Sequence, residues 1–197
     1  MNNTEKKILS VSRNLFAEKD ASQVTVREIA EKSGISHTTI YLYFKSKEEI
    51  IRAIALEPLE NLFEELLEIT KSNQEPAEKL FSLCNHYIAF GFEQKNIYKL
   101  VSLYEGERVD LPSYSALLSK NRMKSLELLR EAIIEWLPAD LAEEKKINIV
   151  RGVFFFLHGI IMTYENEEQQ DLKRIQTIVR DYLDYTILSN HHEEKNY

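Results

Sequence analysis

The chain is short of the residues that disulfides, strands and membrane spans require. Its 197 residues include one cysteine, Cys84, which excludes an internal disulfide and a cysteine-based zinc site. With only 5 glycines and 4 prolines, and no alternating β-branched runs, the sequence predicts a nearly all-helical fold. No apolar run approaches the ~20 residues of a membrane span, and the start, MNNTEKKILS, lacks the apolar core of a signal peptide. We therefore expect a soluble cytoplasmic protein that does not contact a membrane.

Negative charge dominates the chain as a whole but not its first quarter. The net charge is −7. Residues 1–50 carry 8 Lys and Arg against 7 Asp and Glu, whereas residues 51–197 carry 17 against 25. Because DNA binding needs only local positive charge, and a distant acidic body reduces non-specific binding, this composition does not exclude a nucleic-acid partner.

Helix start and stop signals are concentrated in the first 50 residues. Residues 4–19 place apolar side chains at spacings of three and four, which predicts an amphipathic first helix. The second helix begins with a capping box at Thr25–Glu28 and a hydrophobic staple at Val24–Ile29, and Gly34 is the left-handed residue that ends it. The third helix begins with an N-cap at Ser36 and a staple at Ile35–Ile40. A capping box at Ser46–Glu49 begins the fourth helix. The two middle helices form a helix-turn-helix, whose second helix typically enters the major groove of DNA.

The stretch SHTTIYLYFK at residues 36–45 has side chains suited to DNA. Ile40 and Phe44, four residues apart, can pack inward and leave the threonines and tyrosines outside. Threonine offers a hydroxyl and a methyl group to base edges, tyrosine hydroxyls reach phosphates, and Lys47 adds charge beside the amide groups of the next helix. We assign base readout to Thr38, Thr39 and Tyr41, and backbone anchoring to Thr25, Arg27, His37, Tyr43 and Lys47, with Ser36 among the DNA-binding residues. The alternative is a helical segment with exposed aromatic side chains and no DNA contact.

Residues 25–50, TVREIAEKSGISHTTIYLYFKSKEEI, resemble the DNA-binding domain of the Tet repressor (TetR) family. The matching positions are Thr25, Arg27, Ile29, Ala30, Gly34, Ser36, Thr39, Tyr41, Tyr43, Phe44, Lys47 and Glu48. A glycine or proline commonly stands in the family where this chain has Thr38, so the base preference does not carry over. The resemblance implies a dimeric transcriptional regulator, usually a repressor, that binds a pseudo-palindromic double-stranded DNA operator. It also implies release from the operator by a small molecule bound in the C-terminal domain.

Two other classes of protein remain as alternatives, an enzyme and a helical interaction protein that uses the helix-turn-helix fold without DNA. The sequence contains no Gly-rich phosphate loop, nucleophile elbow or His-Glu zinc motif. Cys84, His86 and His158 could be imagined as a metal set, but nothing in the sequence brings them together, so we expect no metal, no cofactor and no enzymatic activity. The local charge of only +1 keeps the interaction protein open.

Residues 47–197 have helical periodicity almost throughout. The fourth helix should run to about residue 71, with a kink or break near Ala55–Glu57, because Pro58 lacks an amide donor. Five more helical stretches follow, at residues 75–94, 96–107, 112–137, 141–167 and 171–190. The predicted fold is all-α, with a three-helix DNA-binding domain at residues 1–46 and a helical effector-binding and dimerisation bundle at residues 47–197.

The body is rich in aromatic side chains, which fits a bundle with an aromatic-lined cavity for a small apolar or amphipathic effector. Each of these side chains, taken singly, is more often part of a core. The residues that we assign to the effector site are Phe63, Tyr87, Phe90, Tyr98, Met123, Phe155 and Met162.

Two glycines seven residues apart indicate a helix face made for close approach. Gly152 and Gly159 destabilise a helix by roughly 1 kcal/mol each relative to alanine, which suggests a packing role. We predict a homodimer interface that comprises Gly152, Phe156, Gly159, Ile175, Val179 and Tyr182, on two neighbouring helices. The alternative is that the glycines only let the helix pack within its own subunit.

Overall fold

The computed structural model describes residues 2–103, 117–164 and 172–189, and within these residues every regular element is helical, as predicted. The helices are α1 (Asn3–Glu18), α2 (Val26–Lys32), α3 (His37–Ile40), α4 (Lys47–Lys71), α5 (Pro76–Glu93), α6 (Lys95–Leu103), α7 (Leu117–Ile134), α8 (Glu143–Tyr164) and α9 (Leu172–Leu183), which continues into a π-helical turn at Asp184–Leu188. Parts of four predicted helices, at residues 104–107, 112–116, 165–167, 171 and 190, lie outside the described residues.

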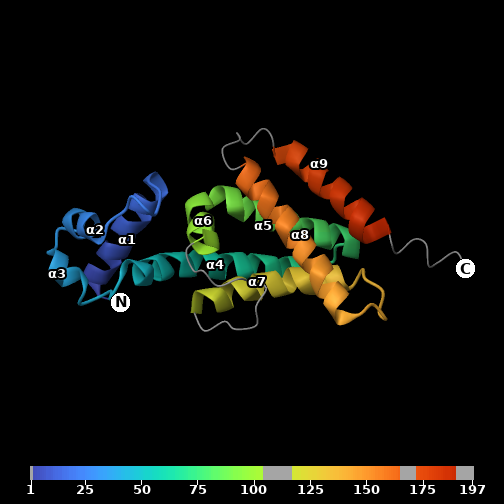
Figure 1. Cartoon of the computed structure of the whole chain (residues 1–197), viewed down its shortest axis with the longest axis horizontal. Coiled ribbons are helices and arrows are strands. Elements are labelled where there is room, and N and C mark those ends of the chain that lie inside the picture. The colour runs from blue at the N-terminus through green and yellow to red at the C-terminus, as the bar shows by residue number, and fades with distance from the viewer. Residues whose placement is uncertain (1, 104–116, 165–171, 190–197) are drawn as a thin grey trace, which may run out of the picture.

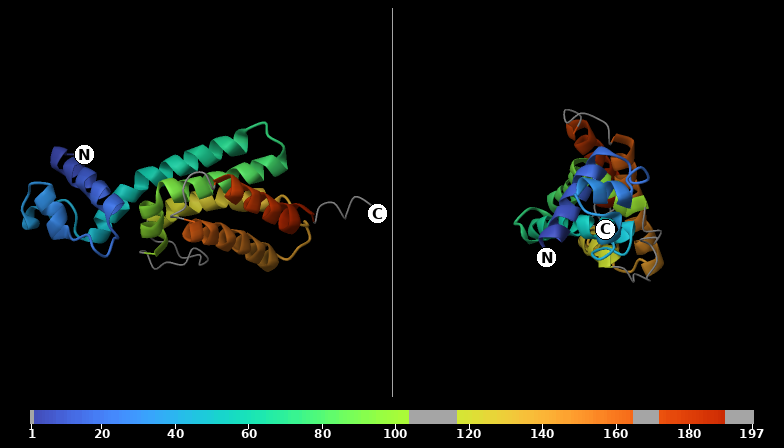
Figure 2. Two further views of the ribbon diagram at one scale, coloured as in Figure 1. Left: turned by 90° about the horizontal axis from the view of Figure 1, so that it is seen from above. Right: turned by 90° about the vertical axis from the view of Figure 1, so that its left-hand side faces the viewer.

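The chain forms a small head and a longer body (Figure 1), joined by α4. The first three helices gather at one end of the molecule, and α4 runs from them along the body, where α5, α7, α8 and α9 pack (Figure 2). We use the word head for α1–α3 and the start of α4, and the word body for the remaining helices.

Helix α4 is continuous through Pro58, so no break occurs near Ala55–Glu57, and a kink there stays a prediction. The proline removes one backbone hydrogen bond, which costs helix stability. The neighbouring residues Ala55, Leu59 and Leu62 are all buried, and their packing holds the helix on both sides of the proline. A 25-residue helix therefore connects the head to the body without interruption.

The hydrophobic core of the head extends beyond residue 46, the predicted domain boundary. Ile50, Ile51 and Ile54 of α4 lie in one buried cluster with side chains of α1, α2 and α3. Leu100 of α6 belongs to the same cluster, with Ile97 packed against it. The head is thus completed by the first two turns of α4 and contacted by α6 from the body.

The body has a core of its own, which α4, α5, α7, α8 and α9 share. One close helix contact in it involves a glycine that the sequence analysis did not single out, Gly91 of α5. A Cβ atom on Gly91 would lie only 2.6 to 2.8 Å from three side-chain carbons of Ile161 in α8, well inside van der Waals contact. The absence of a side chain at Gly91 is what allows α5 and α8 to approach this closely.

Candidate DNA-binding surface and effector cavity

Local capping interactions hold the helix-turn-helix in shape. The Thr25 hydroxyl accepts a hydrogen bond from the amide of Glu28 at 3.1 Å, and the Ser36 hydroxyl accepts one from the amide of Thr39 at 3.0 Å. Gly34 has a φ of +67°, and the amides of Gly34 and Ile35 donate to the carbonyls of Glu31 and Ala30, which is the Schellman closure of a helix. The predicted caps and the left-handed glycine are therefore confirmed.

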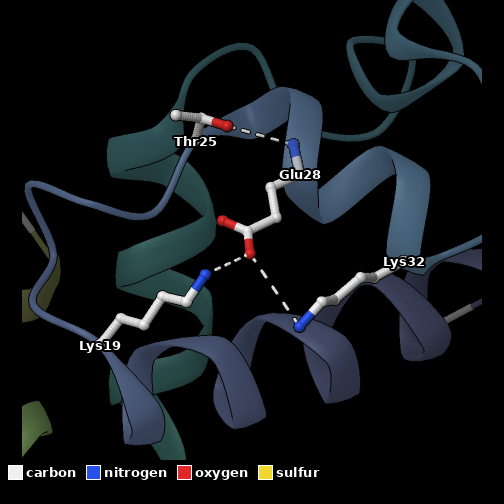
Figure 3. A network of polar contacts seen from close by, with 4 residues as sticks. All are labelled: Lys19, Thr25, Glu28 and Lys32. Atoms are coloured by element: carbon white, nitrogen blue, oxygen red, sulfur yellow. Dashed lines mark hydrogen bonds and ion pairs between the residues drawn. The ribbon is translucent and has the colours of Figure 1, made fainter.

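Both predicted capping boxes are only half formed. The Glu28 carboxylate does not return to the start of its helix but accepts a hydrogen bond from Lys19 Nζ at 2.6 Å, with Lys32 Nζ at 4.0 Å (Figure 3). The hydrogen bond from Lys19 is the main cause that holds the pKa of Glu28 below its ordinary value, against the opposing effect of burial. The Glu49 carboxylate does return to the start of its helix, but it accepts from the amide of Lys45, one residue before the N-cap Ser46. A reciprocal box does exist at Asn2 and Glu5, on α1.

The recognition helix is shorter than the sequence suggests. Helix α3 spans only His37–Ile40, and Tyr41 to Tyr43 form the turn that follows it. The amide of Phe44 still donates to the carbonyl of Ile40 at 3.0 Å, and both of these side chains are buried in the head, as predicted. The two tyrosines are thus presented by a turn and not by the helix itself.

Several predicted DNA-binding residues share one exposed surface, which we call the recognition surface. Ser36, His37, Thr38 and Tyr41 are exposed, and the ring of Tyr41 stands edge-on to the ring of His37 at 5.2 Å. The Ser36 hydroxyl lies 3.0 Å from that of Thr38 and 2.6 Å from that of Thr39. These contacts hold the polar side chains in place before any ligand binds. The other assigned residues divide by exposure, since Thr25 and Arg27 are exposed and Thr39, Tyr43 and Lys47 are half-buried.

Lys47 has a structural role that the sequence analysis missed. Its ammonium group donates to the carbonyls of Ala21 at 2.6 Å and Val24 at 2.9 Å. These bonds tie the first turn of α4 to the loop that precedes α2. A phosphate contact by Lys47 stays a prediction.

Leu42 is an exposed apolar side chain on the head that the sequence analysis did not assign. It follows Tyr41 in the turn after α3, and 82% of its surface is exposed. Because Ile40 and Phe44 are buried, the three residues between them are exposed or half-buried. This spacing could have identified Leu42 from the sequence.

A small cavity lies between α4, α5, α6 and α7. Its lining residues are Leu59, Leu62, Tyr87, Phe90, Tyr98, Val101, Ser102, Ser125 and Leu126. Its volume is about 20 Å³, which is room for about one water molecule. An effector with more than a few atoms therefore needs these helices to move apart.

Three of the seven residues assigned to the effector site line this cavity, namely Tyr87, Phe90 and Tyr98. Phe155 does not, because 65% of its surface is exposed on α8. Phe63 lies under the Lys124 ammonium, and Met162 packs against the body core. Met123 is half-buried and is not among the lining residues. Those four assignments are not supported by the cavity, because helical periodicity gives the apolar face of a helix but not what that face contacts.

Helix α6 contacts the cavity and the head at once. Tyr98 and Val101 line the cavity, and the hydroxyl of Tyr98 lies 2.7 Å from Nδ1 of His158 in α8. On the same helix, the Asn96 side chain donates to the carbonyl of Ala17 in α1 at 2.7 Å, and Leu100 lies in the head core. A change of cavity shape that moves α6 therefore also acts on the head.

The predicted dimer interface divides into exposed and buried parts. Apart from the backbone of its own helix, a Cβ atom on Gly152 or Gly159 would meet no atom of the described residues within 4 Å, so none of these residues packs closely against either glycine. Phe156 is half-buried and stacks on Tyr182 at 3.7 Å between ring centroids. In contrast, Ile175 and Val179 are only 2% and 0% exposed, in the core of their own body.

The assignment of Ile175 and Val179 to the dimer interface is therefore wrong, because these side chains have no surface left to bury against a partner. The reason is that α9 is docked on α5. Arg180 forms two hydrogen bonds with the Glu78 carboxylate and lies 3.7 Å from the ring centre of Phe81.

Helix α8 carries an apolar face that the other described residues do not cover. Among the helices that the structure describes, it is the one that is long and apolar enough to cross a membrane, judged by length and composition alone. The sequence has no uninterrupted apolar run in α8, because Asn148 and Arg151 lie within it, and so this helix was not expected to be so apolar. The core helix of a soluble protein meets the same criteria, and 28% of the apolar window is buried here.

The three residues considered as a metal set do not form one. No group of three or more His, Cys, Asp and Glu that could hold a metal occurs in the described part of the chain. His86 Nε2 instead lies 2.7 Å from the carboxylate of Glu65, and burial raises the pKa of the Cys84 thiol to about 12, which makes it a poor nucleophile.

Residues 8–54 match the sequence profile of the family described as bacterial regulatory proteins, tetR family. The HTH-type transcriptional repressor KstR2 of Mycolicibacterium smegmatis is 26% identical over 132 residues, which are 65% of this chain and 64% of that repressor. This chain therefore spans slightly less than two thirds of that relative. The fatty acid metabolism regulator protein of Bacillus subtilis is 34% identical over 73 residues, which are 37% of this chain and 38% of that protein.

Solved structures share the fold over almost the whole chain. The transcriptional regulator FadR from Bacillus subtilis, in complex with stearoyl-CoA, has a TM-score of 0.65 and 21% identity, covering 90% of this chain and 96% of FadR. At this identity the likeness shows a common fold. It extends the match beyond the head to the helical body.

Proposed function

We infer that this chain, a member of the tetR family of bacterial regulatory proteins by its N-terminal domain, is a DNA-binding transcriptional repressor that a small effector releases from its operator. The observation that carries this inference is the recognition surface. It presents exposed hydroxyl, imidazole and phenol groups on a helix-turn-helix whose caps fix their positions. Such a regulator acts on chromosomal DNA, and so we propose the cytoplasm as its site of action.

The exposed groups divide by the part of DNA that they suit. Thr38, Tyr41 and Leu42 stand on the recognition surface, where a methyl, a ring edge or an isobutyl group can meet a thymine methyl in the major groove. Arg27 and His37 can donate to phosphates, which positions the head without reading sequence. A head with a net charge of only +1 gains modest non-specific affinity, so base contacts should supply much of the discrimination.

The effector that we propose is apolar or amphipathic and contains an acyl chain. Support comes from the cavity, whose described lining is aliphatic and aromatic with a few hydroxyls, and from the stearoyl-CoA bound to the FadR relative. Because the cavity has a volume of about 20 Å³, a bound chain has to select or induce a form with α4 to α7 moved apart. The α6 contact with α1 connects this opening to the head.

We also propose that two copies pair through the uncovered face of α8. Ile147, Phe155 and Gly159 are spaced by eight and four residues, which places them on one face, and all three are exposed. Burying this apolar face against a second copy removes it from water, and a two-fold pair presents two heads to half-sites about 34 Å apart. The glycines at 152 and 159 leave room there for a partner's side chains.

The test of this function is selection of DNA from a library of random genomic fragments by the full-length protein. We expect enrichment of a pseudo-palindromic sequence, binding that weakens steeply as salt rises, and release by stearoyl-CoA. No enriched sequence, or binding that does not respond to salt, would contradict DNA binding and favour the protein-interaction alternative. If the protein binds a specific DNA sequence but no acyl-CoA releases it, the proposal of DNA binding holds and the proposal of an acyl effector is wrong.

A further inference from the structure

Ser125 of α7 is a buried hydroxyl that lines the cavity. Only 1% of its surface is exposed, and its Oγ has no hydrogen-bond partner among the described residues. A buried polar group without a partner costs free energy, so most such groups in folded proteins are satisfied by protein or by water. This hydroxyl is therefore available to a molecule that enters the cavity.

The surroundings of Ser125 decide which chemical group it can bind. Its described neighbours in the lining are mainly aliphatic and aromatic, and none of them is charged. An ionised carboxylate in such a place would lose its hydration without gaining a counter-charge, which is strongly unfavourable. The Tyr98 hydroxyl, which also lines the cavity, is engaged with His158 at 2.7 Å. A neutral oxygen is thus the group that fits Ser125.

We propose that Ser125 is an effector-binding residue whose hydroxyl donates a hydrogen bond to the carbonyl oxygen of an acyl thioester. The alkyl chain would take the apolar lining contributed by Leu59, Leu62 and Leu126. This proposal rests on the proposed function, because the acyl effector comes from there. It adds the residue that recognises the carbonyl and so distinguishes an acyl group from a plain alkyl group.

A water molecule can occupy the place of the ligand oxygen when no effector is bound. The cavity of about 20 Å³ has room for about one water molecule, which can bond to Ser125 before the effector arrives. A ligand oxygen that reproduces the hydrogen bond of a displaced water loses nothing, whereas a methylene group in its place leaves the hydroxyl unpaired. Discrimination between the two ligands therefore follows from the burial of Ser125.

The chain offers a matched control in Ser12 of α1. Its hydroxyl is also fully buried and also lacks a partner among the described residues, but it lies in the head and not in the lining of the cavity. Ser12→Ala and Ser125→Ala thus delete the same chemical group from the same kind of environment. Neither substitution removes a hydrogen bond that the structure shows, so both variants should unfold at a temperature no lower than the wild type.

The experiment compares two probes by titration calorimetry on the full-length protein: stearoyl-CoA and S-octadecyl-CoA, the thioether that has a methylene group where stearoyl-CoA has its carbonyl. Ser125→Ala should weaken stearoyl-CoA about tenfold, the loss expected when a buried acceptor is left unpaired. The same substitution should change the affinity for the thioether less than about twofold, because no hydrogen bond to that probe exists to be lost. Ser12→Ala should change neither affinity.

Each other result would overturn the proposal. An equal loss for both probes would mean that Ser125→Ala alters cavity shape and not a hydrogen bond, and no loss would mean that Ser125 does not contact the effector. Failure of the wild-type protein to bind either probe would exclude the acyl thioester. The inference that the protein binds an operator fails separately, in the DNA selection, and so the two failures can be told apart.

Discussion

The hydroxyl of Tyr98 lies 2.7 Å from Nδ1 of His158, so that one hydrogen bond joins α6 to α8 beside the cavity. The two rings also lie side by side, with their centroids 5.6 Å apart. Since the proposed effector has to move helices around the cavity apart, this bond should stabilise the closed form of the cavity relative to the opened one.

Tyr98→Phe should therefore make the protein more sensitive to its effector. Loss of a hydrogen bond worth about 1 kcal/mol shifts the equilibrium toward the opened form about fivefold. The concentration of stearoyl-CoA that releases half of the operator should fall by this factor in a fluorescence-anisotropy titration. An unchanged or higher concentration would show that the bond is kept when the effector binds.

Leu42→Ala should weaken operator binding without loss of folding stability. The side chain is 82% exposed, so its removal opens no cavity in the head. If it meets a thymine methyl, its loss should cost about 1 to 2 kcal/mol of discrimination, or roughly tenfold in affinity. Gel shifts with the selected operator measure this loss. Ser10→Ala, on an exposed position of α1, is the control and should bind like the wild type.

Gly159→Leu should convert the proposed dimer to a monomer and leave the fold of each subunit intact. Apart from the backbone of its own helix, no atom of the described residues lies within 4 Å of a Cβ placed at this glycine, so the substitution should leave the packing of these residues undisturbed. Across a close two-fold interface it would meet the partner and prevent approach. Analytical ultracentrifugation should show the monomer, and operator binding should be lost because the two heads are no longer linked.

Gly91→Ala also replaces a helical glycine by a larger residue, but it should affect the stability of the subunit and not its assembly. Its Cβ would overlap the side chain of Ile161, so it should destabilise the subunit by about 1 to 3 kcal/mol, as overpacking does, without changing the assembly state. A stable, DNA-competent dimer carrying Gly159→Leu would show that α8 pairs through another face.

The stability of the head should depend on pH through Glu28. The hydrogen bond from Lys19 lowers the pKa of this carboxyl in the folded state from its ordinary value of 4.5. A carboxyl whose folded pKa is lowered stabilises the fold above its unfolded pKa and loses that contribution as pH falls through the folded pKa. Glu28→Gln should thus be less stable than the wild type at pH 7, and the difference should shrink below about pH 4.5. Urea unfolding at pH 7 and pH 3 measures it, and a constant difference would contradict the assignment.

The sequence was sufficient for the head because its structure depends on contacts between residues a few positions apart. Thr25, Gly34 and Ser36 act on amides and carbonyls within five residues, and a linear sequence displays such spacings directly. The redirected carboxylate of Glu28 was missed for the converse reason. Its partner Lys19 precedes it by nine residues, across a loop.

The body could be predicted as helices but not as an arrangement of helices. Tyr87 and Phe155 are both aromatic residues on apolar helices, yet one lines the cavity and the other is exposed. Similarly, Ile175 and Phe155 lie on neighbouring helices predicted to form one interface, although only Phe155 is uncovered. The distinction depends on tertiary contacts, such as the docking of Arg180 on Glu78, that no periodicity contains.

Because α4 is long and unbroken, a small tilt of this helix in the body causes a larger displacement of the head. Its 25 residues extend about 37 Å at the rise of an α-helix, and the buried isoleucines of its first two turns fix it in the head core. If α4 tilts by only about 5° about its end in the body, its end in the head moves by about 3 Å. A hydrogen bond between the head and DNA tolerates a change of only a few tenths of an ångström in its length. In the proposed two-fold pair both α4 helices would tilt, and the spacing between the two heads would change by about twice that amount. Binding an effector that spreads helices by a fraction of their diameter is then enough to take both heads out of register with successive major grooves.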